Sequence, residues 1–222
     1  MKRKLFLMSF FVAVFLVLAA ITPNVGVSAS AASEEKTGVG LSEHVLKAYR
    51  ENWQYRSGCY GQFVNGRRAT DCSGLVKSYL WWTGEKTNPS SKLMSVAGSS
   101  SAMLRSAKVS GTIKYSDSSS LPRVHGLILY QPGHVGVYVG NNMAVDNRES
   151  GVNIKYEKVF GRSSPKWTKW FKLPQITYPT TGLVTFDGKE YYYENGQYIV
   201  NANKLIDGIP YHFDSAGVGT PL

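Results

Sequence analysis

The chain has 222 residues, of which 43% are hydrophobic, and a formal charge of +10 from 25 basic and 15 acidic side chains. A chain of this length can bury a core without a covalent staple, so a disulfide is not required for folding. The basic surplus favours a partner of opposite charge, or simply keeps the surface soluble, but no stretch has the pattern of a nucleic-acid-binding fold.

The amino terminus has the features of a secretory signal peptide. A basic triplet at 2–4 precedes an apolar run at 5–21, and small residues at 27–31 offer cleavage sites. The alternative is a membrane anchor, but the apolar run is short for a spanning helix. We therefore predict a signal peptide at 1–31 and a linker at 32–40. The exported product would carry 22 basic against 15 acidic residues, a charge of +7, with no membrane attachment after cleavage.

Two helices are expected in the first part of the exported chain. Ser42 can cap the first helix, because apolar residues follow it at helical spacing. A second set of apolar residues at spacings of three and four predicts a helix from Cys72 to Trp82, closed by Gly84. Asp71 is the expected N-cap of this second helix.

Cys72 would lie in the first turn of that helix. Unpaired backbone N–H groups and the positive end of the helix dipole favour a thiolate over a thiol there. Cys72 is therefore a candidate nucleophile. The alternative is a buried structural cysteine, or one that pairs with Cys59, the other cysteine of the chain. A nucleophilic Cys72 must be free, which would leave Cys59 as a small core residue.

The rest of the first domain is predicted to be a loop region followed by a sheet. Residues 85–120 are rich in serine and only weakly periodic, with one short helix at 101–108. Strands are expected at 124–130, 133–139, 143–146, 152–156 and 167–173. His134 lies on the second of these strands, on the face opposite its valines. Helices followed by an antiparallel sheet indicate an α+β domain.

Two runs of sequence carry a resemblance to a known family. They are Asp-Cys-Ser-Gly-Leu-Val from Asp71 and Gly-His-Val-Gly-Val-Tyr-Val-Gly from Gly133. Both resemble the pattern of the NlpC-type cell-wall endopeptidases without a gap. The resemblance covers roughly residues 40 to 175 and implies a papain-like cysteine peptidase domain, which we place at 41–175.

The resemblance also implies roles for particular residues. Cys72 would attack the carbonyl carbon, and His134 would take the thiol proton and later protonate the leaving amine. The backbone N–H of Cys72 would hold the oxyanion. Tyr60, twelve residues before Cys72, stands where the family has an active-site tyrosine, which could be a second donor. Asp71 and Ser73 would face the amino side of the bound peptide.

The third catalytic residue is expected at Asp146. The family has a polar residue about twelve positions after the histidine, and this spacing leads from His134 to Asp146. A carboxylate there could accept the Nδ1–H of His134 and stabilise the imidazolium that forms with the thiolate. The alternative is that Asn147 orients the histidine, as asparagine does in papain-like enzymes.

The composition changes after Pro174. The pattern at 186–196 recurs twenty residues later at 206–217, which predicts hairpins stacked on one another. The repeat resembles choline- and glucan-binding cell-wall repeats, but it has no tryptophan where those repeats usually carry one. We therefore predict a degenerate wall-binding tail at 176–222, with wall teichoic acid or polysaccharide as its partner.

Together these features predict a secreted peptidoglycan hydrolase that cleaves stem or cross-link peptides of bacterial peptidoglycan. One alternative is an N-acetylmuramoyl-L-alanine amidase, since related cysteine folds use the same triad. Another is a wall-binding protein without activity. No cofactor or metal ion is expected, because the remaining histidines show no ligand spacing with one another: His44, His125 and His212.

Overall fold

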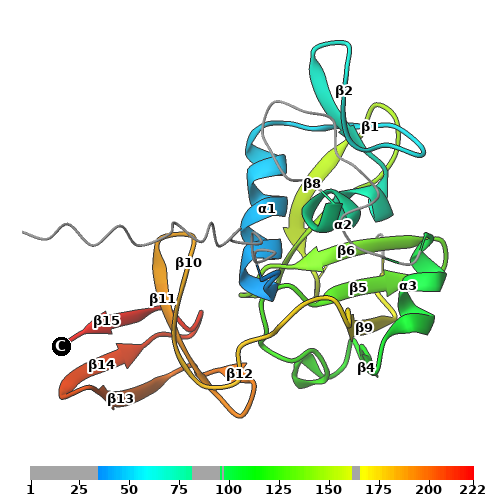
Figure 1. The fold of residues 1–222 in the computed structure, drawn as a ribbon. Coiled ribbons are helices and arrows are strands. Elements are labelled where there is room, and N and C mark those ends of the chain that lie inside the picture. The colour runs from blue at the N-terminus through cyan, green and yellow to red at the C-terminus, as the bar shows by residue number, and fades with distance from the viewer. Residues whose placement is uncertain (1–34, 82–95, 97, 162–165) are drawn as a thin grey trace, which may run out of the picture. The chain divides into compact units, whose positions relative to one another are not determined.

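The computed structural model describes residues 35–81, 96, 98–161 and 166–222. The predicted signal peptide and Gly84 lie outside these residues. The described part is an α+β fold of helices and mainly antiparallel strands (Figure 1). Its helices are α1 (Gly38–Arg50), α2 (Cys72–Trp81), α3 (Ser100–Ser106) and a short 3₁₀ turn (Ser118–Ser120). None of them is both long and apolar enough to cross a membrane.

The first helix begins earlier than the sequence pattern predicted. Thr37 is its N-cap, and the Thr37 side chain accepts a hydrogen bond from the backbone N–H of Gly40. Ser42 is instead buried inside α1, where its hydroxyl donates to the carbonyl of Tyr138. The apolar spacing located the helix correctly, but two residues able to cap it stand five positions apart.

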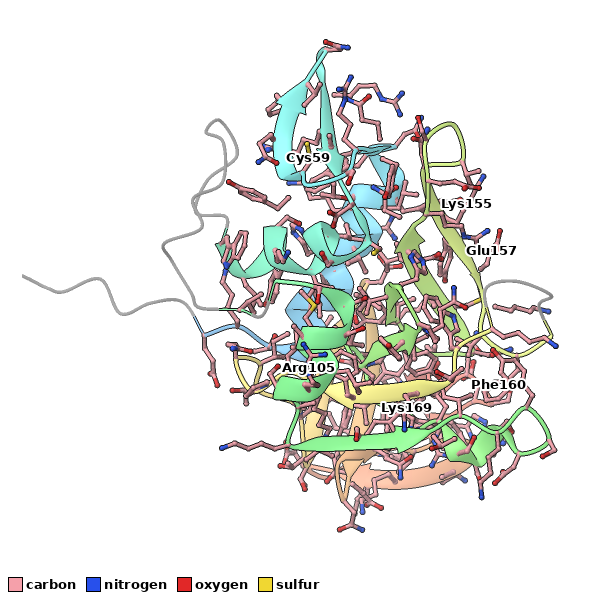
Figure 2. All side chains as sticks on the ribbon, turned by 90° about the vertical axis from the view of Figure 1, so that its right-hand side faces the viewer. Cys59, Arg105, Lys155, Glu157, Phe160 and Lys169 are labelled. Carbon is pink, nitrogen blue, oxygen red and sulfur yellow. The ribbon has the colours of Figure 1, made fainter. Side chains whose placement is uncertain are left out.

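The main sheet contains six strands in the order β4-β9-β5-β6-β7-β8, with every pair antiparallel. Helices α1 and α2 pack against strands β6 and β7 of this sheet (Figure 1). Its strands are β4 (Val109–Thr112), β5 (Ile128–Gln131), β6 (His134–Tyr138), β7 (Met143–Asn147), β8 (Ile154–Lys158) and β9 (Lys169–Lys172). Figure 2 labels two residues along β8, Lys155 and Glu157.

Two details of this sheet differ from the sequence prediction. The strand expected at 124–130 begins only at Ile128, because Gly126 has a φ of +83° and lies against the backbone of Gly38. Strand β4 falls inside the region expected to be loops. Its sequence, Val-Ser-Gly-Thr, has too little apolar character to stand out, and it forms as an edge strand on β9.

A small three-stranded sheet leads into the cysteine helix. It has the order β1-β3-β2, from β1 (Gln54–Tyr55), β2 (Tyr60–Val64) and β3 (Arg67–Thr70). Asn65 and Gly66 both have positive φ and make the tight turn between β2 and β3. Strand β3 ends one residue before Asp71, so the small sheet fixes where α2 begins.

The carboxy-terminal segment forms antiparallel pairs at the repeat period. Strands β10 (Gly182–Phe186) and β11 (Lys189–Glu194) are joined at Asp187-Gly188, and β13 (Ala202–Ile206) and β14 (Ile209–Phe213) at Asp207-Gly208. All four turn residues have positive φ, as a two-residue hairpin turn requires. Strands β12 (Gln197–Tyr198) and β15 (Gly219–Pro221) complete this sheet.

The first hairpin shares a core with the domain that precedes it. His125 is fully buried, and its ring stacks on Tyr198 with 5.1 Å between ring centroids. The Tyr193 hydroxyl lies 2.8 Å from Nδ1 of His125 and accepts the His125 backbone N–H. These two tyrosines belong to one continuous hydrophobic cluster with α1, α2 and the main sheet, together with Phe186 and Tyr191.

Candidate active site

Cys72 is the first residue of α2, as the sequence predicted. The Asp71 side chain accepts a hydrogen bond from the backbone N–H of Gly74 at 2.6 Å, which is the geometry of an N-cap. The backbone N–H groups of Cys72 and Ser73 donate to no other described residue. Both thiols, Cys72 and Cys59, are free. A free thiol therefore lies beside two unpaired N–H groups at the positive end of a helix.

Gly74 has a packing reason to be glycine. A Cβ atom at this position would lie 1.9 Å from the carbonyl oxygen of Cys59. That carbonyl accepts the backbone N–H of Asp71 at 2.9 Å, so the segment that contains Cys59 crosses directly over the first turn of α2. The glycine of the Asp-Cys-Ser-Gly run lets the small sheet approach the cysteine.

His134 begins β6 and lies in a largely enclosed place. Its side chain is 13% exposed, and its ring is parallel to that of Trp167, with 5.5 Å between centroids and 12° between planes. A Cβ on Gly136 would lie 2.8 Å from the Trp167 ring and 3.0 Å from Cβ of Asp146. The second glycine of Gly-His-Val-Gly therefore makes room for the two side chains that hold the histidine.

Asp146 lies on β7 and is fully buried. Its Oδ2 atom accepts a hydrogen bond from Nε2 of His134 at 2.9 Å. The sequence located this pair correctly but assigned the wrong ring nitrogen, since Nδ1 was expected to face the carboxylate. With Nε2 turned to Asp146, Nδ1 is the ring nitrogen left for Cys72, which is close enough to contribute to the raised pKa of His134. Spacing along a strand cannot decide which edge of a ring faces a neighbour.

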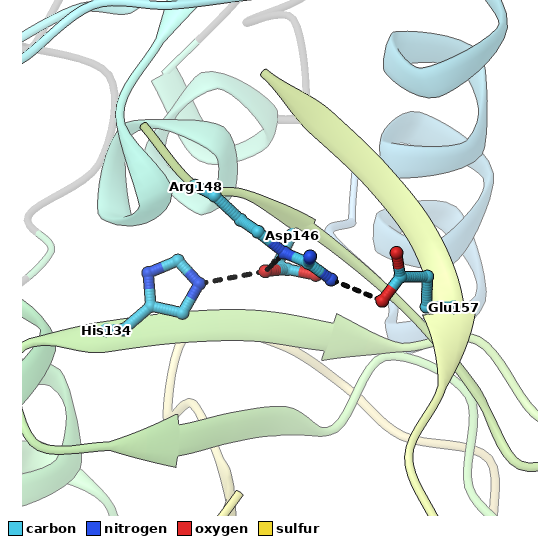
Figure 3. Close-up of polar contacts among 4 residues, drawn as sticks. All are labelled: His134, Asp146, Arg148 and Glu157. Atoms are coloured by element: carbon cyan, nitrogen blue, oxygen red, sulfur yellow. Dashed lines mark hydrogen bonds and ion pairs between the residues drawn. The ribbon is translucent and has the colours of Figure 1, made fainter. Parts of the chain in front are cut away.

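The carboxylate has a second cationic partner that the sequence reasoning missed. Nε of Arg148 lies 2.9 Å from the same Oδ2 atom, and a terminal nitrogen of Arg148 lies 2.6 Å from Oε2 of Glu157 on β8. Figure 3 shows these side chains in a line from His134 to Glu157. A signal for Arg148 was present, because it lies two residues after Asp146, just past the end of β7, and residues two apart in an extended chain point to the same face.

This arrangement favours a charged histidine. Burial alone would lower the pKa of His134, but the hydrogen bond to Asp146 and the nearby Cys72 outweigh it and raise the pKa from 6.5 to about 9. Burial would likewise raise the pKa of Asp146, but the hydrogen bonds from His134 and Arg148 keep the pKa below its usual value. Near neutral pH the site therefore holds an imidazolium between a carboxylate and a cysteine.

A cleft of about 440 Å³ opens over Cys72. Asp71 and Ser73 line it, as the resemblance implied, although both carboxylate oxygens of Asp71 accept bonds from their own neighbourhood. The residues that line it are Tyr55, Ser57, Gly58, Asp71, Cys72, Ser73, Lys77, Gly98, Ser99, Ser100 and Gly133.

The structure does not bring Tyr60 to this cleft. Its ring packs edge-on against Trp81 with 4.9 Å between centroids, nine residues along α2 from Cys72, or roughly 13 Å. Tyr55 lines the cleft instead. Burial, and then the charge of the neighbouring Cys72, raise the pKa of Tyr55. A count along the chain missed this residue because Tyr55 reaches the cleft through the pairing of β1 with β3, opposite Thr70.

Asn147 does not orient the histidine. It holds the strands that lead to Cys72 against β7. Its side chain is fully buried, and Nδ2 donates to the Thr70 hydroxyl at 2.8 Å, to the Thr70 carbonyl at 3.0 Å and to the Gln54 carbonyl at 3.2 Å. One amide therefore joins β7 to β1 and β3, two residues before the thiol.

We expect Asn147→Ala to lower both stability and thiol reactivity. The change removes the donor to the Gln54 carbonyl and the Thr70 hydroxyl, while the Thr70 carbonyl keeps the backbone N–H of Arg56, and the loss costs about 2–4 kcal/mol of unfolding free energy. Urea unfolding measures this loss, and iodoacetamide labelling of Cys72 reports the misplaced thiol. A variant with the wild-type urea midpoint and labelling rate would contradict the role assigned to Asn147.

A thiol, an imidazolium and a buried carboxylate beside a cleft define a candidate cysteine hydrolase. The sequence model of the NlpC/P60 family matches residues 53–173, more than half of the chain, and the chain belongs to this family. Family membership points to a cell-wall peptidase that acts on peptidoglycan. No curated protein matches the chain at a significant level. Across the described ranges, no cluster of His, Cys, Asp or Glu could hold a metal ion.

Proposed function

We propose that this protein is a secreted peptidoglycan hydrolase that cuts a peptide bond in stem or cross-link peptides with Cys72, His134 and Asp146. The observation that carries the proposal is the pairing of Nε2 of His134 with the buried carboxylate of Asp146, which leaves Nδ1 of the same ring for the free thiol of Cys72. Those residues lie within the segment matched by the NlpC/P60 family. Their order, cysteine on a helix and then histidine on a strand, supports a papain-like arrangement.

The reaction would proceed through a thioester. Sγ of Cys72 attacks the carbonyl carbon of the peptide bond, and its proton resides on Nδ1 of His134. The C–N bond then breaks, and the imidazolium gives its proton to the leaving amine. Water next attacks the thioester with His134 as the base, which releases the acid and restores the thiol. Asp146 keeps the ring oriented throughout, through Nε2.

The negative charge that forms on the substrate oxygen needs donors close to Cys72. The unpaired backbone N–H groups at the start of α2 are suitably placed. We assign the second, side-chain donor to Tyr55, because it lines the same cleft, whereas Tyr60 packs on Trp81. Lys77 also lines the cleft, but its amino group is bonded to Ser73 and to the carbonyl of Gly98.

The closest alternative is an amidase, since a thiol site of this form could also cut between muramic acid and alanine. Mass analysis of wall fragments separates the two activities. An endopeptidase creates a new amino terminus on an amino acid within the peptide, whereas an amidase leaves a free lactyl end on the amino sugar. Lactyl ends alone, in a digest that Cys72→Ala does not produce, would replace the endopeptidase proposal with the amidase.

The tail is proposed to hold the enzyme at the wall. The twenty-residue repeat supports this role, as do apolar side chains that the second hairpin exposes to solvent, such as Leu205 and Ile209. Teichoic acid or wall polysaccharide is the proposed ligand, to which the overall basic charge is complementary. Secretion rests on the signal peptide predicted at 1–31.

The alkaline limit of activity should depend on Asp146. Asp146→Asn removes the negative charge that favours protonated His134, so the pKa of His134 should fall from about 9 toward its ordinary value. Because the imidazolium is needed, the alkaline limb of the kcat/KM profile should move to lower pH and maximal activity should fall. An alkaline limb that remains near pH 9 in the folded variant would show that Asp146 does not set this pKa.

A further inference from the structure

Arg148 and Glu157 extend the line of polar side chains beyond the three proposed catalytic residues. Asp146 is 0% exposed, whereas the Arg148 side chain is 20% exposed and that of Glu157 is 41% exposed. The line therefore runs from the enclosed histidine out to solvent at β8 (Figure 3). Neither the family resemblance nor the spacing of the cysteine and histidine assigns a role to this pair.

We propose that Arg148, held by Glu157, is a positioning residue that keeps Asp146 ionised and correctly oriented while His134 gains and loses its proton. A buried carboxylate costs several kcal/mol unless cations and hydrogen bonds compensate it. His134 supplies such a cation only while it is protonated. Arg148 is charged at every working pH, so it compensates Asp146 through both halves of the reaction.

The state of Asp146 decides which nitrogen of a neutral His134 carries the proton. A carboxylate accepts from Nε2–H, which leaves the lone pair of Nδ1 free to take the Cys72 proton. A protonated Asp146 would donate to Nε2 and would force the proton onto Nδ1. That tautomer cannot accept the thiol proton. By keeping Asp146 ionised, Arg148 stabilises the His134 tautomer that can accept the thiol proton. Its hydrogen bond to the same Oδ2 atom also fixes the orientation of the carboxylate.

Glu157 has the opposite electrostatic effect. The positive charge of Arg148 alone would repel the imidazolium and lower the pKa of His134. Glu157, 2.6 Å from the guanidinium, offsets this charge and fixes the position of the side chain. Other charged or titratable groups also lie near these four side chains. They are Tyr55 and Cys72 on the side of the cleft and Lys155 on β8, in addition to His134 and Arg148, which contact Asp146, and Glu157, which contacts Arg148.

Lys155 offers a matched control. It is the cross-strand partner of Asp146 on β8, two residues before Glu157, and Figure 2 labels both residues. The side chain of Lys155 forms no hydrogen bond or ion pair with another described residue, although its backbone belongs to the β7–β8 ladder. Arg148→Gln and Lys155→Gln therefore remove the same charge from the same neighbourhood, but only the first removes a contact to Asp146.

The test is the pH dependence of Cys72 alkylation by iodoacetamide, measured in the full chain by peptide mapping. This reaction reports the thiolate–imidazolium pair and needs no substrate. Because the role of Arg148 rests on the proposed function, this choice separates the two: a wrong substrate would leave the alkylation profile unaffected. Activity on soluble wall fragments is measured alongside as a second readout.

Substitutions of Arg148 and Glu157 should shift the pH profile of alkylation in opposite directions. In Arg148→Gln the pKa of Asp146 rises, so the acid limb of alkylation should move up by about one pH unit, a tenfold slower reaction on that limb. Arg148→Lys keeps the charge without the planar fork and should recover part of the loss. In Glu157→Gln the alkaline limb should move down, because the charge of Arg148 is no longer offset. Lys155→Gln should keep the wild-type profile.

Three results would overturn the proposal. The first is a folded Arg148→Gln protein whose alkylation profile coincides with that of the wild type. The second is an equal shift of the acid limb in Lys155→Gln, which would show that the loss of any positive charge nearby, rather than the contact of Arg148 with Asp146, causes the shift. If Arg148→Gln does not fold, Glu157→Gln decides the matter, since its side chain is partly exposed. An alkaline limb unchanged in that variant would show that the pair does not act on His134.

Discussion

Cys72→Ala should reduce hydrolysis of peptidoglycan to background, a loss of at least about a thousandfold, because the other described thiol, Cys59, does not line the cleft. The fold should survive, since Cys72 is only half buried and alanine suits the first turn of a helix. We expect an unfolding free energy within about 1 kcal/mol of the wild type. Zymography and thermal unfolding measure these two quantities on the same preparation.

Cys59→Ser is the control for this variant. Cys59 contributes to the site through its backbone carbonyl, which accepts the Asp71 N–H, rather than through its thiol. Serine preserves the carbonyl, so most activity should remain. If Cys59→Ser proved as inactive as Cys72→Ala, the division of roles between the two cysteines would be wrong.

Removing the whole tail should prevent folding rather than merely weaken wall binding. A chain that ends at Thr180 loses four buried aromatic side chains from the shared core: Phe186, Tyr191, Tyr193 and Tyr198. At about 1.5–3 kcal/mol each, their burial is comparable with the entire stability of a typical domain. The cut also exposes His125 and removes Asp187, which forms an ion pair with Arg50 of α1 at 2.6 Å.

A shorter deletion separates core packing from wall binding. A chain that ends at Asn201 keeps β10, β11 and β12, and it loses the second hairpin, whose aromatic residues Tyr211 and Phe213 lie outside the continuous cluster. This variant should fold, cleave soluble muropeptides at the wild-type rate and sediment less with isolated walls. For the longer deletion, a soluble chain that ends at Thr180 and melts at the wild-type temperature would show that the shared core contributes nothing to the free energy of unfolding.

The parts of the site that the sequence predicted depend on local patterns. Asp71 and Cys72 could be placed because capping and helical spacing act within one turn. His134 and Asp146 could be paired because they lie on adjacent strands of a meander, where a short turn fixes the offset. The hairpins of the tail followed from Asp-Gly pairs at a constant period.

The parts that the sequence did not predict depend on contacts between distant segments. Trp167 reaches His134 from 33 residues away, and no periodicity links them. Tyr55 lines the cleft from β1, whereas Tyr60 on β2 packs against Trp81 at the far end of α2, and a count along the chain from Cys72 cannot tell these two places apart. The shared core around His125 was hidden by the repeat itself, since the two hairpins look alike in sequence but only the first packs on the main domain.

The most direct test of the proposed activity is to capture its covalent intermediate. A soluble muropeptide is mixed with the enzyme, the reaction is stopped in acid within milliseconds, and the intact protein and its proteolytic fragments are weighed. We predict a thioester on the fragment that contains Cys72, with a mass gain equal to the amino-side part of the peptide, and none in Cys72→Ala. An adduct on any other residue, or cleavage that persists in Cys72→Ala, would contradict the account.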